Sequence, residues 1–458
     1  MMFFAVYVIV VIVTAVECQD RLWTRMAGTS SSDEGKGVAL DSSGAVYVAG
    51  FVTGDVNGET QLGSRDILLL KYASDGMLEW TRIAGTVDWD EGYAVAVDRI
   101  SGAIYVTGQA GSNLFGQTNA GGSDIVLMKF ASDGTILWTR LAGSSGWDAG
   151  YSVAVDSTSG AVYVTGYVSG SLDGQTFIGS FADIVLLKYD SDGIKQWTRL
   201  VGSTSDDYGN AVAVDPTSGA VYVTGGTYGS VQGQTNYGKQ DTFLLKYAGD
   251  GSLIWAQQMG GIEVDEGHAI AIDSASHAVY VAGYSYSALY DESNQGDGDA
   301  FIMKFSEAGG LLWTRMVGTS GFDTAYGVVV GASSNVYVTG FAGGSVDGQP
   351  TVSSRDLLLM MYASNGTRVW TRMDGTSGFD ASHGIALAST GELYIAGAVE
   401  GSMHGEPYQY GSDVFLSRYS TNESVPVDPP DTVCQYRTFK EVASQTIFSR
   451  YRCIKVNN

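Results

Sequence analysis

The chain has 458 residues, of which 16% are charged and 62 are glycine. Its 49 acidic residues outnumber 25 Lys and Arg, which gives a formal net charge of −24 at pH 7. Such a charge repels nucleic acid phosphates and anionic membranes, and it favours cations and basic surfaces as ligands. These numbers indicate a soluble protein with a large core that does not bind nucleic acid.

The N-terminus is an apolar run from Phe3 to Val13 with no Lys or Arg before it. This length is typical of a signal-peptide core, and it is shorter than the ~20 residues that span a membrane. We therefore expect a signal peptide over residues 1–18, cleaved after Ala15 or Cys18, and no membrane span in the mature protein. An uncleaved signal anchor is the alternative. The expected location is secreted or on the extracellular surface.

One stretch, a tryptophan followed by a glycine and then an aspartate, recurs along the chain at intervals of 57 to 59 residues, and in six of its seven copies it begins Trp-Thr-Arg. The glycine lies five residues after each tryptophan and the aspartate ten residues after it. A period of this length indicates a repeat architecture and must be interpreted before any local structure. The repeated tryptophans are Trp23, Trp80, Trp138, Trp197, Trp255, Trp313 and Trp370.

A single unit, residues 90–143, contains four β-rich runs separated by turn residues. The runs are residues 93–97, 103–108, 124–130 and 136–141, and no window shows helical periodicity. The Ser-Asp-Gly turn before the last run suits a hairpin, since glycine allows a positive φ. Four antiparallel strands in about 58 residues, repeated along a chain, predict the blade of a β-propeller.

The repeats predict how the ring closes. The first three strands of the unit occur seven times, the last copy ending near Tyr419, whereas the first Trp strand (residues 21–28) precedes them all. We therefore expect an all-β, seven-bladed β-propeller over residues 19–423, in which the N-terminal strand completes the last blade. Closure would remove the exposed sheet edges that an open solenoid, the rival interpretation, would leave.

The repeat resembles a known family, the bacterial-type SBBP β-propeller repeat. The resemblance rests on Asp-Glu-Gly-x-x-Val-Ala-Val-Asp at residues 90–98 and on Gly-x-x-Tyr-Val-Thr-Gly at residues 102–108. It also rests on the Asp-x-x-Leu-x-Lys-Tyr/Phe strand and the Asp-Gly turn. It covers about residues 21–419 and implies a secreted or surface-exposed propeller, while the family carries no single activity or catalytic motif to transfer.

Residues 424–458 differ in composition, with prolines in a linker followed by a mildly basic tail. Cys434 and Cys453 lie in this tail, and in an exported chain they are expected to form a disulfide. The tail is interpreted as a small cap on the acidic body, with a flexible tail as the alternative. Asn365 and Asn422 begin N-glycosylation sequons, which matter if the source organism glycosylates.

Four aromatic residues occupy the position nine residues after a repeated tryptophan: Trp89, Trp147, Phe322 and Phe379. They are expected on the face that carries both the blade-to-blade loops and the loops between the second and third strands. Aromatic side chains beside carboxylates and amides are typical of sugar recognition, which uses stacking and hydroxyl hydrogen bonds. Packing between blades is the alternative role for these four residues.

Two sets of carboxylates raise the question of a cation site. The repeated aspartates, two per unit, are interpreted chiefly as acceptors for turn N–H groups, because a residue present in every blade usually serves the blade. The loop from Asp291 to Asp299 is rich in the oxygen ligands that calcium takes. It predicts a Ca²⁺ site made of Asp291, Asn294, Asp297 and Asp299, although it lacks the EF-hand spacing.

Catalytic signatures are sparse. The four histidines show no metal-ligand spacing, and neither a Ser-His-Asp set nor a phosphate-binding loop is found in the sequence. We therefore favour a secreted, monomeric, non-enzymatic scaffold that binds an extracellular protein on the loop face. A carbohydrate-binding module, assisted by calcium, is the second hypothesis. A polysaccharide hydrolase or lyase with its site at the channel mouth is the third, so catalysis stays open.

Overall fold

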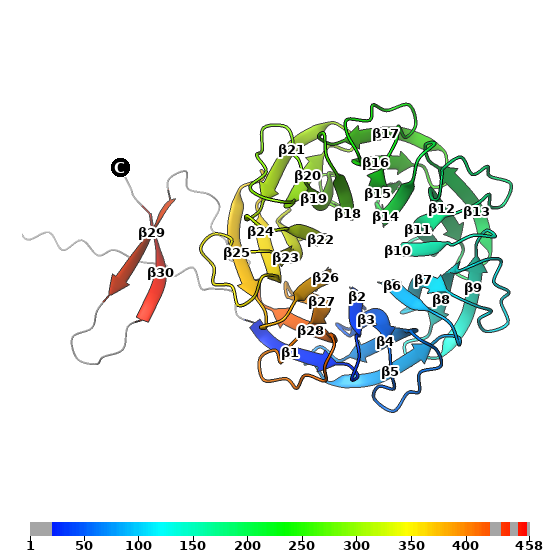
Figure 1. The fold of residues 1–458 in the computed structure, drawn as a ribbon, viewed down its shortest axis with the longest axis horizontal. Helices are drawn as coiled ribbons and strands as arrows, with labels where there is room; N and C mark the ends of the chain where they lie inside the picture. Colours follow the sequence, from blue (N-terminus) through cyan, green and yellow to red (C-terminus); the bar gives the residue numbers. More distant parts are fainter. Residues whose placement is uncertain (1–20, 422–431, 440–447, 456–458) are drawn as a thin grey trace, which may run out of the picture.

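The computed structural model describes residues 21–421 and two further strands, residues 432–439 and 448–455. Seven four-stranded antiparallel sheets stand around a central axis like the blades of a propeller (Figure 1). The predicted fold class is confirmed. Among the residues that the structure describes, no helix is long and apolar enough to cross a membrane.

Each blade runs from an innermost first strand to an outermost fourth strand (Figure 1). Blades 1 to 4 comprise β2 (Glu34–Leu40), β3 (Val46–Val52), β4 (Asp66–Tyr72) and β5 (Leu78–Ala84); β6 (Glu91–Val97), β7 (Ile104–Ala110), β8 (Asp124–Phe130) and β9 (Ile136–Ala142); β10 (Ala149–Asp156), β11 (Ala161–Val168), β12 (Asp183–Tyr189) and β13 (Lys195–Val201); β14 (Asp207–Val214), β15 (Val221–Thr227), β16 (Asp241–Tyr247) and β17 (Leu253–Met259).

The remaining blades follow the same order, except that the last takes its outer strand from the N-terminus. Blades 5 to 7 comprise β18 (Asp265–Ile272), β19 (Val279–Ser285), β20 (Asp299–Phe305) and β21 (Leu311–Val317); β22 (Thr324–Val330), β23 (Val336–Ala342), β24 (Asp356–Tyr362) and β25 (Arg368–Asp374); β26 (Asp380–Leu387), β27 (Leu393–Val399), β28 (Asp413–Tyr419) and β1 (Arg21–Ala27). A separate hairpin pairs β29 (Thr432–Phe439) with β30 (Phe448–Lys455).

The N-terminal strand closes the ring as predicted, since β1 pairs with β28 in antiparallel register. A polar network fixes this strand as well. The Thr24 hydroxyl lies 2.8 Å from the Ser417 hydroxyl and 3.0 Å from Nδ1 of His404. The other ring nitrogen of His404 lies 2.9 Å from the carboxylate of Asp374 in blade 6. Closure therefore ties β1 to blade 7 and, through His404, to blade 6.

The core of each blade is built on a row of three side chains across its second, third and fourth strands. In blade 1 the row is Tyr47, Lys71 and Trp80, which are register partners. The Tyr and Trp rings lie 6.0 Å apart, and the Lys ammonium lies 5.6 Å from the centre of the Tyr ring. The tyrosine is fully buried, so the row combines a large apolar burial with a cation–π contact.

Each row also bonds to the next blade. The Trp80 indole N–H and the Lys71 ammonium donate to the carbonyl of Ser132, which lies in the β8–β9 turn of blade 2, at 3.2 and 3.1 Å. Arg82 donates through Nε to the carbonyl of Gly134 in the same turn, at 3.1 Å. We call these bonds the blade latch. The corresponding arginines that latch their neighbours are Arg25, Arg140, Arg199 and Arg315.

The latch explains why blade 6 departs from the repeat. Blade 7 has no turn between its third and fourth strands, because the fourth strand comes from the other end of the chain. The lysine of the row is accordingly replaced by Met361, which is 1% exposed. Arg372 lies over the ring of Tyr419 at 4.8 Å, in place of the contact that the other arginines make with a turn. The other five repeated arginines each donate through Nε to a turn carbonyl of the next blade, so their role is structural.

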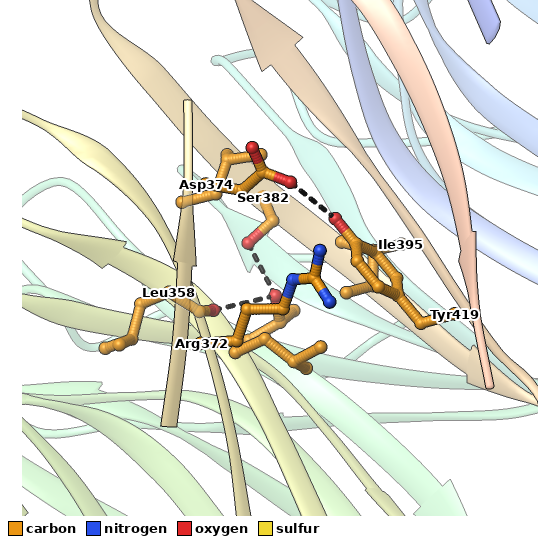
Figure 2. A pocket seen from close by; sticks show the side chains of 9 residues that line it. Leu358, Arg372, Asp374, Ser382, Ile395 and Tyr419 are labelled. Carbon is orange, nitrogen blue, oxygen red and sulfur yellow. Dashed lines mark hydrogen bonds between the residues drawn. The ribbon is translucent and has the colours of Figure 1, made fainter. Parts of the chain in front are cut away.

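A cavity of about 10 Å³ lies at this boundary, lined by residues that include Arg372, Asp374 and Ser382 (Figure 2). Tyr419 donates to Asp374 at 3.3 Å, and Thr339 bridges Ser382 and the carbonyl of Leu358. A volume of this size holds about one water molecule. The cavity is therefore too small for an organic ligand and belongs to the ring closure.

Removing residues 21–28 should open the ring, because β28 would lose its pairing partner and expose an edge. We expect the shortened protein to melt on the order of 10 °C lower and to associate, as measured by thermal melting and light scattering. A synthetic peptide of residues 19–30 should restore the melting temperature. A shortened protein as stable and monomeric as the parent would contradict closure by this strand.

The latch can be tested at Arg140, whose Nε donates to Gly193 at 2.7 Å. Arg140→Ala removes charge-assisted hydrogen bonds between blades, so the free energy of unfolding should fall by about 1–3 kcal/mol in urea titrations. Arg99→Ala, at an exposed turn position, is the matched control and should change it by less than about 0.5 kcal/mol. Equal effects at both positions would show that the latch does not stabilise the ring.

Candidate functional site

The repeated aspartates lie on the face formed by the blade-to-blade loops and the loops between second and third strands, which we call the loop face. The first series begins with Asp33 and Asp90 and is buried in every blade. Asp90 accepts from the backbone N–H of Thr86 at 2.5 Å and of Gly111 at 3.0 Å, so its carboxylate joins two loops. The same arrangement with two backbone donors recurs at Asp148, Asp323 and Asp380.

The second series opens the third strand of each blade and is also buried. Asp124 accepts from the N–H of Ala120 at 3.0 Å, while its other oxygen has no protein hydrogen-bond partner. Gly143, five residues after Trp138, lies against that oxygen, since a Cβ on this glycine would be only 2.4 Å from it. A glycine is therefore required at this repeated position, because a side chain would clash with the carboxylate. Unpartnered oxygens recur at Asp66, Asp183, Asp241, Asp299 and Asp413.

An aspartate of the first series lies near one of the second series, and the charge of one contributes to the raised pKa of the other. Burial raises the pKa of Asp124 to about 6, and the charge of Asp148 contributes to the shift. The unpartnered oxygen favours the protonated form for the same reason, because a buried charge without donors is costly. Burial likewise raises the pKa to about 6 at Asp207, Asp265, Asp323, Asp380 and Asp413.

These shifts predict the pH dependence of stability. The pKa values in the folded state lie above the unfolded value of about 3.9, so the folded protein binds these protons more tightly than the unfolded chain does. The contribution of these carboxyls to the stability of the folded state is complete below the unfolded pKa, and it is lost as the pH rises through about 6. We expect the free energy of unfolding to be lower at pH 8 than at pH 5, by on the order of 1 kcal/mol per shifted carboxyl.

Urea titrations at the two pH values, on wild type and Asp124→Asn, check this prediction. The amide keeps an acceptor for the Ala120 N–H but carries no charge, so the variant should lose stability less steeply between pH 5 and pH 8. Asp133→Asn, in an exposed turn where hydrogen bonds from Thr135 lower the pKa of the carboxyl, is the control and should not flatten the slope. A wild-type stability that rises with pH would contradict the assignment.

Three of the four predicted aromatic residues are exposed on the loop face: Trp89 (49%), Trp147 (58%) and Phe379 (54%). Two of them are held by arginines of the preceding blade. The Arg65 guanidinium lies 4.3 Å from the centres of both the Trp89 and Phe51 rings. Arg355 lies 4.2 Å from Phe341 and 5.4 Å from Phe379. Trp89 and Phe379 are therefore ordered and still offer open ring surface.

Phe322 is placed differently, because it is partly buried in an aromatic cluster. Its ring is stacked on Tyr286 at 5.6 Å and meets Tyr284 edge-on at 5.1 Å. The four aromatic residues thus divide between the two predicted roles, ligand binding and packing between blades. The packing interpretation fits Phe322, and exposed surface is found at the other three.

An open groove of about 480 Å³ lies beside Trp89, on the loops of blade 2. It is lined by Thr86, Val87, Gly111, Ser112, Asn113, Asn119 and Gly121. The loop that carries Asn119 continues to Gly122, where a Cβ would be 2.9 Å from the ring of Trp147. The loop that lines one side of the groove therefore also contacts Trp147, and the groove is lined mainly with hydroxyl, amide and backbone groups.

The innermost strands supply a set of residues that the sequence analysis did not identify. Each has a β-bulge near its middle, where one residue is left out of the pairing. The following strand has a glycine there, and a Cβ on Gly108 would be only 1.8 Å from the carbonyl of Glu91. The seven bulged residues, one per blade around the central axis, are Lys36, Tyr93, Tyr151, Asn210, His268, Tyr326 and His383.

The bulged side chains touch their neighbours around the ring. Tyr93 and Tyr151 meet edge-on at 5.3 Å, and Tyr326 lies 4.9 Å from His268 and 5.0 Å from His383. A bulge redirects a side chain, here toward the axis. The signal was present in the sequence, because the residue type at this position changes from blade to blade while the surrounding strand repeats.

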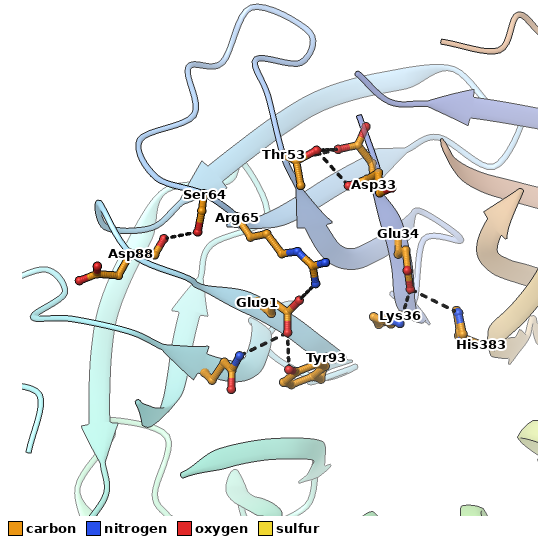
Figure 3. A network of polar contacts seen from close by, with 12 residues as sticks. Asp33, Glu34, Lys36, Thr53, Ser64, Arg65, Asp88, Glu91, Tyr93 and His383 are labelled. Atoms are coloured by element: carbon orange, nitrogen blue, oxygen red, sulfur yellow. Dashed lines mark hydrogen bonds and ion pairs between the residues drawn. The ribbon is translucent and has the colours of Figure 1, made fainter. Parts of the chain in front are cut away.

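A polar network joins these residues to the loop face (Figure 3). Glu91 accepts from Arg65, Tyr93 and the amide of Gln109. Glu34 pairs with Lys36 and lies 3.7 Å from His383. Burial, together with the positive charges of Lys36, His268 and Arg355, holds the pKa of His383 well below its usual value. The channel thus carries neutral histidine beside two satisfied carboxylates.

The predicted calcium residues lie in the β19–β20 loop and at the start of β20. Asp291 and Asp297 are exposed, and Asp299 is buried and accepts from the N–H of Gln295 at 2.6 Å. The amide of Asn294 donates to the carbonyl of Ser285 at 2.9 Å, which orders the loop. Among the described residues, no group of three or more His, Cys, Asp or Glu is arranged to hold a metal. Calcium binding stays a prediction.

The other predicted positions lie partly outside the described residues. Residues 1–18, predicted as a signal peptide, and the sequon at Asn422 are outside them. Asn365 is exposed in the β24–β25 turn. Cys434 and Cys453 are direct register partners in the β29–β30 hairpin, and their side chains are outside the description.

Comparison with known proteins supports the repeat. Residues 196–231 and 254–291 match a family model described as the beta-propeller repeat SBBP, which confirms the predicted resemblance. Regulatory protein FlaEY of Caulobacter vibrioides is 28% identical over 305 residues, which is 58% of this chain and 31% of that protein. An uncharacterized WD repeat-containing protein, L264, of Acanthamoeba polyphaga mimivirus is 23% identical over 358 residues, 59% of this chain and 25% of its own length.

The chain therefore spans less than a third of each of these curated relatives. Among solved structures, a protein of unknown function from Bacteroides caccae aligns with 59% of this chain and 78% of its own. That alignment has 12% sequence identity and a TM-score of 0.35.

Proposed function

We propose that the protein is a secreted, non-enzymatic propeller scaffold that binds an extracellular partner protein on its loop face. The observation that carries this proposal is the pair of exposed aromatic rings, Trp89 and Phe379, each ordered by an arginine of the preceding blade. Similarity to a regulatory protein and to a WD repeat-containing protein supports an interaction role.

The physical argument is that of an interface hot spot. Trp, Tyr and Arg dominate binding energy at protein interfaces, and a side chain already held in place loses less entropy on binding. Arg65 is held by its ion pair with Glu91, so the Trp89 ring rests on a fixed support. The proposal of secretion is supported by the apolar N-terminus and by the facing positions of Cys434 and Cys453.

The test compares wild type with Trp89→Ala/Phe379→Ala, each immobilised and exposed to the extracellular fraction of the source cells. A partner should be retained by wild type and reduced at least tenfold on the variant, as measured by quantitative mass spectrometry. The matched control is Leu137→Ala/Leu312→Ala, which removes exposed apolar side chains (53% and 56%) from outer strands. A partner held equally by all three proteins would refute binding through the loop face.

The groove on the loops of blade 2, beside Trp89, favours carbohydrate as a second candidate ligand. Its amide and hydroxyl lining can bond to sugar hydroxyls, and the flanking indoles offer stacking surfaces. We expect binding to a glycan array to be lost in both Trp89→Ala and Trp147→Ala. Unchanged glycan binding by the double variant would exclude this groove as the sugar site.

A further inference from the structure

The charged residues of the channel divide unevenly between its two sides. Among the described residues, the cations on or near the innermost strands are Lys36 of β2, Arg65, which pairs with Glu91 of β6, and Arg355, whose charge acts on His383 of β26. The carboxylates are Glu34, Glu91 and Glu266. Glu34 pairs with Lys36, and Glu91 pairs with Arg65. Glu266, on blade 5, has no cationic partner among the ion pairs of the described residues, so its negative charge is uncompensated.

Glu266 is held in place by two neutral donors. The amide of Asn210 donates to one carboxylate oxygen at 2.8 Å, and the Tyr284 hydroxyl donates to the other at 3.0 Å. Gly226 of blade 4 makes room for the side chain, since a Cβ there would be 3.2 Å from Cγ of Glu266. Blades 1, 3, 5 and 6 have an aromatic residue at the corresponding position, which would fill the space that Gly226 leaves to the side chains of Gln240 and Glu266.

Tyrosines surround this carboxylate. Tyr167 lies 5.6 Å from Tyr151 and 5.4 Å from Tyr208, which makes a continuous aromatic wall across blades 3 and 4. After burial, the charge of Glu266 contributes to the raised pKa of Tyr151, Tyr208, Tyr228, Tyr284 and Tyr326. All five hydroxyls therefore stay neutral at physiological pH, and Tyr284 is the one whose hydroxyl bonds directly to Glu266 among the described hydrogen bonds.

An aromatic wall around one uncompensated carboxylate suits an organic cation. The faces of tyrosine rings attract ammonium and guanidinium groups, and desolvation strengthens that attraction. A free anion would be repelled by Glu266 and by the net charge of −24. Lys239, the nearby blade 4 cation, is exposed and pairs with Glu263 in the loop, so it does not neutralise Glu266.

We propose that Glu266 and the surrounding tyrosines form a receptor for a basic side chain, lysine or arginine, that the partner protein inserts into the channel mouth. This inference rests on the proposed function and specifies the chemistry of the partner. The loop-face aromatics would bind the body of the partner, and the channel would select a basic residue at its tip.

The experiment measures binding of small probes by isothermal titration calorimetry and by NMR of the probe. The probes are Nα-acetyl-lysine methylamide, Nα-acetyl-arginine methylamide and the neutral Nα-acetyl-norleucine methylamide. Wild type should bind a cationic probe saturably and norleucine at least tenfold more weakly. Glu266→Gln, which keeps the acceptor for Asn210 but removes the charge, should weaken the cation at least tenfold.

Glu263→Gln is the matched control, because it removes the same charge from an exposed, paired position and should change binding less than twofold. Tyr228→Ser, at a residue 44% exposed, should weaken binding without disturbing the core. Equal binding of norleucine and lysine, unchanged binding by Glu266→Gln, or binding of methyl glycosides in place of the cations would overturn the proposal.

The outcome is separable from that of the proposed function. Partner capture that depends on Trp89 and Phe379, with no saturable binding of either cationic probe, would reject only the basic-residue receptor. Cation binding that depends on Glu266, with capture unaffected by the loop-face variants, would instead reject the loop face as the partner surface.

Discussion

The bonds between each outer strand and the turn of the following blade hold the ring together. A blade alone could bury only one of its two faces. The row of Tyr, Lys and Trp allows the second face to be buried as well, because the row packs against the neighbouring blade and bonds to the carbonyls of that blade's turn. Without these bonds, the turn carbonyls and the partly buried Lys and Trp donors would lack hydrogen-bond partners. The latch therefore couples neighbouring blades from one to the next around the ring.

Closure has a local consequence where the chain ends meet. Blade 7 cannot offer a turn to blade 6, so the latch is absent there, and Met361 replaces the lysine that would have had no carbonyl to bond. The polar network through Thr24, His404 and Asp374 joins the same blades instead. A departure from a repeat can thus record the topology of closure and need not record a ligand.

Two positions in the first strand of each blade have different roles, one in holding the loops together and one in lining the central axis. At its start, buried aspartates tie the loops together in every blade, which fixes the loop face. At its middle, a bulge turns one residue per blade toward the axis, where the residue type is free to vary. Repetition at the first position and variation at the second are consistent with a rigid frame around an adaptable channel.

Much of the fold could be predicted from the sequence, because a fixed period constrains every blade at once. The strands, the number of blades and the closing strand all followed from the spacing of Trp23 and its copies. The loop-face positions of Trp89, Trp147 and Phe379 also followed, since the order of strands decides which loops share a face.

The sequence by itself determined the architecture and the capping role of the repeated aspartates. Only the tertiary structure decided that Phe322 packs against Tyr284 and Tyr286, and that Glu266 is bonded by Tyr284 of its own blade and Asn210 of the preceding blade and by no cation among the described ion pairs. The physical reason is distance along the chain. Residues far apart in the sequence meet across blade boundaries, and a single sequence records the period of the repeat but not which of its variable side chains face one another.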